Sequence, residues 1–155
     1  MNPRSPTQLA DDTSGQLWLP TSLAAQLEKW AAAGYPFEIC GLLIGRHHGH
    51  EVETVSVTSA QNLARDRRRD RYLLDPDDFL AADREAQADG LEIVGFWHTH
   101  PDHPARPSQV DLDAAWEGYS YLIIATNATG AVELRSWSLQ GGRFVQQVVR
   151  REEQT

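Results

Sequence analysis

The sequence contains a single cysteine, Cys40, and a single lysine, Lys29, among its 155 residues. One cysteine excludes an intramolecular disulfide and any zinc site that needs four cysteines. Long apolar runs are lacking too: the longest, Tyr121 to Ala125, is far below the roughly 20 residues of a bilayer-spanning helix. The segment before Gly15 has no apolar centre, so we expect no secretory signal and a cytoplasmic protein.

Positive charge is also scarce. The 14 Lys and Arg residues are outnumbered by 22 Asp and Glu, for a formal net charge of −8. A general nucleic-acid binder needs a basic face to neutralise phosphates, so this balance argues against that class. A hydrophobic content of 41% with a mean hydropathy of −0.49 indicates one globular core. We expect a tail at 1–15, a single domain at 16–150 and a short tail at 151–155.

The apolar pattern predicts strands and helices along the whole domain. Helical spacing and capping signals predict helices over 21–34, 76–90 and 108–116. Apolar runs and alternation predict strands over 17–19, 39–44, 52–57, 72–74, 91–97, 119–125, 132–139 and 144–149. This order predicts an α+β fold of sandwich-like form, with a mixed, largely antiparallel β-sheet flanked by helices.

The chemically informative segment begins with His98 and His100, two residues apart at the end of a predicted strand. Side chains alternate along a strand, so both imidazoles leave the same face, with Cα atoms about 6.6–7 Å apart. Imidazoles so placed can converge on one metal ion. A polar strand end without a metal is the alternative interpretation of the same pattern.

A third ligand is available eleven residues after His100. Ser108 and Asp111 have the spacing of a capping box, which puts Asp111 in the first turn of a helix close to the strand end. Two histidines, one carboxylate and an open fourth position are typical of a catalytic rather than a structural zinc site. Alternatively, Ser108 and Asp111 only cap the helix.

Hydrolysis at such a site also needs a general acid/base. Glu38 opens the apolar run Ile39–Ile44, where a carboxylate is out of character. By itself, the position of Glu38 is weak evidence for a general acid/base, because a glutamate at the start of a strand is usually just exposed.

Together these residues resemble the JAMM family of zinc metallopeptidases, also called the MPN-plus or JAB family. Its pattern is an upstream Glu, then His-x-His, seven residues, Ser, two residues and Asp. The sequence has Glu38, His98-Thr99-His100, residues 101–107, Ser108 and Asp111 at this spacing. The resemblance implies the cytidine-deaminase-like MPN/JAB fold over most of the chain, from about Trp18 to Val149.

The resemblance also implies a role for each matching residue. His98, His100 and Asp111 would bind one zinc ion per chain. Glu38 would take a proton from the attacking water and deliver it to the leaving amine. Ser108 would donate a hydrogen bond to the oxyanion that forms during hydrolysis.

The family cuts peptide or isopeptide bonds after the C-terminal Gly-Gly of ubiquitin-like proteins. The short chain and its Glu-Ile-Cys-Gly and Pro-Asp-His-Pro-Ala-Arg-Pro-Ser segments resemble the small stand-alone prokaryotic branch, which acts on ubiquitin-like sulfur carriers. We therefore expect such a carrier as partner and no nucleic acid or membrane; the oligomeric state stays open. Alternatives are removal of a conjugated modifier and a non-catalytic MPN scaffold.

Other interpretations of the polar residues carry less weight. His98, His100, Asp102 and His103 also fit the HxHxDH signature of metallo-β-lactamases, but that fold needs further histidines downstream and this sequence has none after His103. The histidines at 47, 48 and 50 could hold a second metal but favour a polar turn. Cys40 as a nucleophile is disfavoured, because free cysteines are often simply buried. The run Arg65–Arg71 is either a solvated loop or a basic docking patch.

Overall fold

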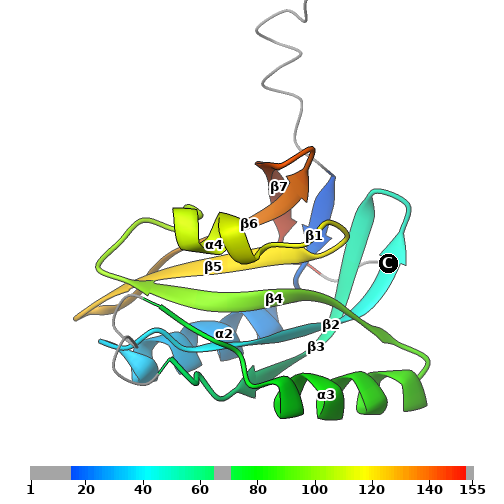
Figure 1. The fold of residues 1–155 in the computed structure, drawn as a ribbon, viewed down its shortest axis with the longest axis horizontal. Coiled ribbons are helices and arrows are strands. Elements are labelled where there is room, and N and C mark those ends of the chain that lie inside the picture. Colours follow the sequence, from blue (N-terminus) through cyan, green and yellow to red (C-terminus); the bar gives the residue numbers. More distant parts are fainter. Residues whose placement is uncertain (1–14, 65–70, 153–155) are drawn as a thin grey trace, which may run out of the picture.

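The structure, a computed structural model, describes residues 15–64 and 71–152. Within these ranges the elements are β1 (Gln16–Trp18), α2 (Thr21–Gly34), β2 (Cys40–His48), β3 (Glu51–Ala60), α3 (Pro76–Ala88), β4 (Glu92–Pro101), α4 (Gln109–Ala114), β5 (Ser120–Asn127), β6 (Gly130–Gln140) and β7 (Arg143–Arg150) (Figure 1). The expected tails, apart from residues 15, 151 and 152, and positions 65–70 of the arginine run lie outside the described residues.

The strands close into a barrel in the order β1-β3-β2-β4-β5-β6-β7. The short strand β1 completes it, because it pairs in parallel with β3 on one side and with β7 on the other. Leu17 is opposite Val52 and Val149 in these two pairings. β4 and β5 are also parallel, whereas the remaining neighbours are antiparallel.

The barrel corrects the expected α+β fold, in which helices flank a sheet in a sandwich-like arrangement; that prediction is wrong. Alternation of apolar residues indicates which face of a strand is buried, but not which strands pair. The three residues of β1 give no sign in the sequence that they connect β3 to β7. The helix α4 is also shorter than expected, because its six residues end at Ala114 rather than near 116.

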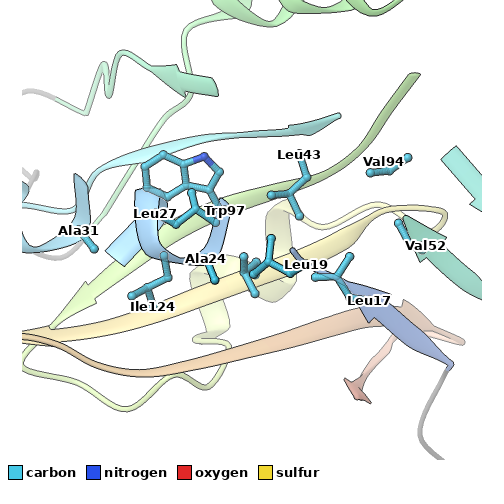
Figure 2. Packing of buried hydrophobic residues seen from close by; sticks show 11 residues of the cluster. Leu17, Leu19, Ala24, Leu27, Ala31, Leu43, Val52, Val94, Trp97 and Ile124 are labelled. Carbon is cyan, nitrogen blue, oxygen red and sulfur yellow. The ribbon is translucent and has the colours of Figure 1, made fainter. Parts of the chain in front are cut away.

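The main core lies between α2 and the inner face of the barrel. Leu27 and Ala31 of the helix pack in one buried cluster with Leu43, Trp97 and Ile124 from three strands (Figure 2). The rings of Trp97 and Trp30 also stack, with centroids 5.9 Å apart. Burial of this apolar surface holds α2 against the strands.

A second apolar cluster lies on the other face of the central strands. Ala82 and Ala86 of α3 contact Leu42, Ile44 and Ile93. α3 begins as the Asp75-Pro76 pair predicts, since the Asp75 carboxylate accepts a hydrogen bond from the Asp77 N–H at 2.9 Å.

The two clusters define the faces of β4. Trp97 belongs to the inner cluster and Phe96 packs against the outer one. By alternation, His98 and His100 share the face of Phe96. Among the described residues, no helix has the length and apolar character needed to cross a membrane.

Gly41 is required by the packing of Trp97. The indole N–H of Trp97 donates to the Thr58 carbonyl at 2.8 Å. A Cβ at Gly41 would lie 1.9 Å from that carbonyl oxygen and 2.3 Å from the indole nitrogen, so no side chain fits there without moving backbone.

Gly41→Ala is therefore expected to lower the free energy of unfolding by roughly 1–3 kcal/mol, the usual cost of overpacking a core. Urea unfolding measures the loss. Gly90→Ala is the control, because Gly90 has φ +70° and open space around it. An added methyl group there costs only backbone strain of about 1 kcal/mol. A Gly41→Ala loss no larger than that of Gly90→Ala would contradict the packing argument.

Candidate metal centre

The two histidines of β4 point toward one another on the outer face of the strand. Their Nε2 atoms are 3.1 Å apart, and both side chains are buried. β4 extends to Pro101, so the histidines lie within the strand and not just beyond an end at 97. The ladder on both sides of β4 therefore fixes their backbone: His98 is opposite Cys40 of β2 and Ile123 of β5.

Asp111 completes a three-residue cluster. Its two carboxylate oxygens lie 3.2 Å from His98 Nε2 and 3.1 Å from His100 Nε2. The residue is held by the capping box of α4: the Ser108 N–H donates to Asp111 Oδ2 at 2.9 Å, and the Asp111 N–H donates to Ser108 Oγ at 3.1 Å. The cap therefore orients the carboxylate as well as starting the helix.

The tautomer of His100 follows from its second contact. His100 Nδ1 lies 2.9 Å from the Pro104 carbonyl oxygen, which can only accept. Nδ1 must then carry the proton when the ring is neutral, and the lone pair of Nε2 faces Asp111 and His98. Orientation of a ligating imidazole through its other nitrogen is a common feature of metal sites.

The loop that supplies Pro104 is fixed at Asp102. This residue has a φ of +60°, the left-handed conformation that aspartate tolerates better than most residues. Its N–H donates to the Thr126 carbonyl at 2.7 Å. The Tyr35 hydroxyl lies 3.0 and 2.8 Å from its two carboxylate oxygens. Tyr35 at the end of α2 thus holds the turn that places Pro104 under His100.

Glu38 reaches the same site from the segment before β2. Ile39 and Thr99 exchange two hydrogen bonds: the Thr99 N–H donates to the Ile39 carbonyl, and the Ile39 N–H donates to the Thr99 hydroxyl, both at 3.0 Å. The Asn62 side chain also donates to the Glu38 carbonyl at 2.9 Å. One ligand atom each of Glu38, His98 and His100 lies within 4.8 Å of the others, and Glu38 is only 5% exposed.

The cluster opens into a cavity of about 290 Å³, and Ser108 lines it beside Glu38, His100 and Asp111. The Ser108 hydroxyl accepts from the Asp111 N–H, so its own proton is available to a bound molecule. The structure thus brings all five residues of the sequence pattern to one site: His98, His100 and Asp111 in mutual contact, Glu38 adjacent, and Ser108 at the wall.

The surroundings of the two imidazoles shift their pKa values in opposite directions. Complete burial lowers the pKa of His98 and outweighs the hydrogen bond to Asp111. Burial also acts to lower the pKa of His100, but its hydrogen bonds to Asp111 and Pro104 raise it overall. Burial acts to raise the pKa of Asp111, yet hydrogen bonds from His100 and His98 hold it well below its usual range. Asp111 is therefore ionised and His98 neutral at neutral pH.

These donors fit a metal ion. The contacting atoms are two imidazole nitrogens, 3.1 Å apart, and the two oxygens of one carboxylate, each 3.1–3.2 Å from one of those nitrogens. A tetrahedral ion with bonds near 2.0–2.1 Å separates its ligands by about 3.3 Å. The neutral His98 imidazole and the ionised Asp111 carboxylate are also in the forms that bind metal.

Two other polar groups of the sequence do not join the site. Burial, followed by the charges of Asp78 and Glu38, raises the pKa of Cys40 to about 12, so its thiol stays protonated. Asp102 contacts Tyr35 and not the histidines, which removes the basis for a metallo-β-lactamase interpretation.

The histidines expected in a polar turn form no second centre within the described residues, and His47 and His48 end strand β2, so that only Gly49 and His50 form the turn. His47 lies 3.2 Å from Glu92, and His48 lies 3.8 Å from Glu53. Among residues 15–64 and 71–152, no group of three or more His, Cys, Asp and Glu away from His98 and His100 has the spacing of a metal site.

The sequence interpretation missed Tyr72, which covers the site. Its ring stacks on His98, with centroids 4.4 Å apart, and burial raises its pKa so that the phenol stays neutral. Residues 72–74 were expected to form a strand, but only Leu74 forms a bridge, with Asn62. The only sequence signal for a role of Tyr72 is that an aromatic residue directly follows a run of charged ones. Tyr35 gave none, because its partner Asp102 is 67 residues away.

Comparison with known proteins agrees with this arrangement. Residues 20–140 match the family described as prokaryotic homologs of the JAB domain. A desampylase of Haloferax volcanii is 31% identical over 118 residues, covering 76% of this chain and 81% of the relative. A probable TtuB-protein conjugate cleaving protease of Thermus thermophilus is 28% identical over 133 residues, covering 86% and 82%.

Solved structures of similar chains have a similar fold. A protein of Desulfitobacterium hafniense superposes with a TM-score of 0.77 at 28% identity, covering 88% of this chain and 94% of that one. A protein of Salinibacter ruber gives a TM-score of 0.66 at 36% identity, covering 86% and 90%. The barrel with its histidine–carboxylate cluster is thus a JAB-type domain. The chain belongs to the prokaryotic JAB family.

The contact between Tyr35 and Asp102 is testable by itself. Tyr35→Phe removes the hydroxyl and should speed hydrogen exchange at the amides of Asp102 and His103, with a stability loss of about 1 kcal/mol. Tyr119→Phe is the control, because the Tyr119 ring packs on Phe96 and its hydroxyl makes no hydrogen bond within residues 15–64 and 71–152. Exchange rates that are equal in both variants would show that Tyr35 does not hold the turn.

Proposed function

We propose that the protein is a zinc-dependent peptidase or isopeptidase that cleaves after the C-terminal Gly-Gly of a ubiquitin-like protein. The observation that carries the proposal is the convergence of Glu38 on the cluster of His98, His100 and Asp111. The hydrolase class rests on family membership and on relatives named as a desampylase and a conjugate-cleaving protease. A cytoplasmic location and a single domain at 16–150 between two tails belong to the same proposal.

In this mechanism His98, His100 and Asp111 hold the ion. Zinc, when bound, supplies a Lewis acid that activates water near neutral pH and polarises the scissile carbonyl. Glu38 accepts a proton from the attacking water and transfers it to the leaving amine, a role for which its buried position beside the ligands is suited. The Ser108 hydroxyl donates to the developing oxyanion from the cavity wall.

The partner is a ubiquitin-like or sulfur-carrier protein. The two relatives are named for cleavage of such conjugates, which supports this partner class for the present chain. A tail that ends in two glycines brings no side chains to the scissile bond, so it can lie against the buried cluster. Scaffolding without catalysis is disfavoured, because the candidate ligands and Glu38 are all present in one site.

Glu38→Gln separates metal binding from proton transfer. The variant should bind zinc with a stoichiometry near one and lose activity by a factor of at least about 100, the usual contribution of a general acid/base. Zinc content by elemental analysis and turnover by intact mass measure the two effects. Glu85→Gln, an exposed change on α3 with the same loss of charge, is the control. Full turnover by Glu38→Gln would refute the assignment.

The two cleavage modes can be compared directly. We would incubate the zinc-loaded protein with a sulfur carrier extended beyond Gly-Gly and with a ubiquitin-type isopeptide conjugate. Cleavage of at least one, abolished by a chelator and by Asp111→Asn, is the expected result. Absence of both cleavages in a zinc-loaded protein that still binds the carrier would instead support the scaffold interpretation.

A further inference from the structure

The depression over the candidate metal centre has two arms of different chemistry. The cavity that contains Glu38 and Ser108 continues into a second one of about 200 Å³, and both are lined by Tyr72, Val110 and Asp111. The second cavity is walled by apolar residues, among them Leu73 and Trp116, which are 59% and 71% exposed. The first has a cationic side, with Arg71 and Arg106 in its wall.

Arg71 and Arg106 are not held by ion pairs, a property that they share with Arg84 and Arg143 among the described residues. The protein has a net charge of −8, and several described arginines pair with carboxylates: Arg46, Arg135, Arg150 and Arg151. Within residues 15–64 and 71–152, no carboxylate lies within salt-bridge distance of Arg71 or Arg106. Both side chains are exposed at the cavity mouth. Their guanidinium groups are therefore available to an anion that enters the site.

We propose that Arg106, assisted by Arg71, binds the free α-carboxylate of the residue released by hydrolysis. The inference rests on the proposed function. A guanidinium group offers paired N–H donors that match a carboxylate. The acyl and amine sides of a scissile bond extend in opposite directions, so a carrier tail in the apolar arm directs the leaving residue toward Arg106.

The reaction balances without any additional reactant. Water adds across the amide: the C–N bond after Gly-Gly breaks, a C–O bond forms that leaves a carboxylate on the second glycine, and both protons of the water pass to the nitrogen of the released residue. The product amino acid then carries both an ammonium group and the carboxylate that Arg106 holds. A lysine joined through its side chain to a modifier has no free α-carboxylate at this distance. The site is thus selective for short linear extensions over isopeptide conjugates.

The test uses the zinc-loaded protein and three peptides: acetyl-Gly-Gly-Ala with a free carboxylate, its C-terminal amide, and acetyl-Gly-Gly-Asp amide. We expect the free acid to have a KM roughly three- to tenfold below that of the alanyl amide, typical of a partly exposed charge-assisted contact. Arg106→Gln should bring these two KM values together, and Arg106→Lys should restore part of the difference. Arg84→Gln, an exposed change on α3 with the same change in charge, should preserve the difference.

Peptide binding to the Glu38→Gln variant, measured by calorimetry, is independent of turnover. The same acid-over-amide preference, lost when Arg106→Gln is added, supports the carboxylate site even if no peptide is cleaved, an outcome that would count against the proposed function alone. Equal affinities for acid and amide, or a preference that survives Arg106→Gln, would overturn the proposal of a carboxylate site at Arg106. Preference for the aspartyl amide over the alanyl acid would also overturn it, because the carboxylate recognised would then be a side chain.

Discussion

The pairing of Ile39 with Thr99 is the constraint on which the site depends. Two hydrogen bonds join β4 to the residue just before β2: the Thr99 N–H donates to the Ile39 carbonyl, and the Ile39 N–H donates to the Thr99 hydroxyl. Each partner is flanked by a functional residue: Glu38 precedes Ile39, while His98 and His100 enclose Thr99. The middle residue of the His-Thr-His segment thus sets the distance between the candidate base and the candidate ligands. A slip of one residue in this pairing would turn the histidines toward the inner core.

The remaining groups are positioned from outside the barrel strands. α4 supplies Asp111 through its capping box, and the loop before it supplies the Pro104 carbonyl that orients His100. Tyr72 covers His98 from a segment with almost no regular structure. Rigid strands therefore hold the two imidazoles, whereas loops and a helix of six residues complete the site. Such a division is common in enzymes, in which a stable scaffold carries variable connections.

The sequence pattern named residues that lie together in the structure, whereas the fold that it indicated was wrong. The spacing of Glu38, His98, His100, Ser108 and Asp111 is a local pattern except for one long interval, and the structure gathers these residues in one place. The architecture depended on pairings that periodicity does not encode. The apolar Leu17-Trp18 pair predicts a short strand, but tertiary contacts determine that this strand pairs with β3 and β7. Tyr35 and Asp102 escaped notice for the same reason, because nothing near either residue indicates the other.

The position of β1 also has a consequence for the order in which the chain folds. Leu17 pairs with Val149, 132 positions further along the sequence, and the Leu19 N–H donates to the Arg150 carbonyl. Contacts between such distant residues form slowly, because a long loop must close before they contribute. During synthesis β1 can meet β3 early, but it must wait for β7 until the residues up to Arg150 have left the ribosome. The ring of strands is therefore completed late, although the β2–β4 pairing that holds the candidate ligands can form before it.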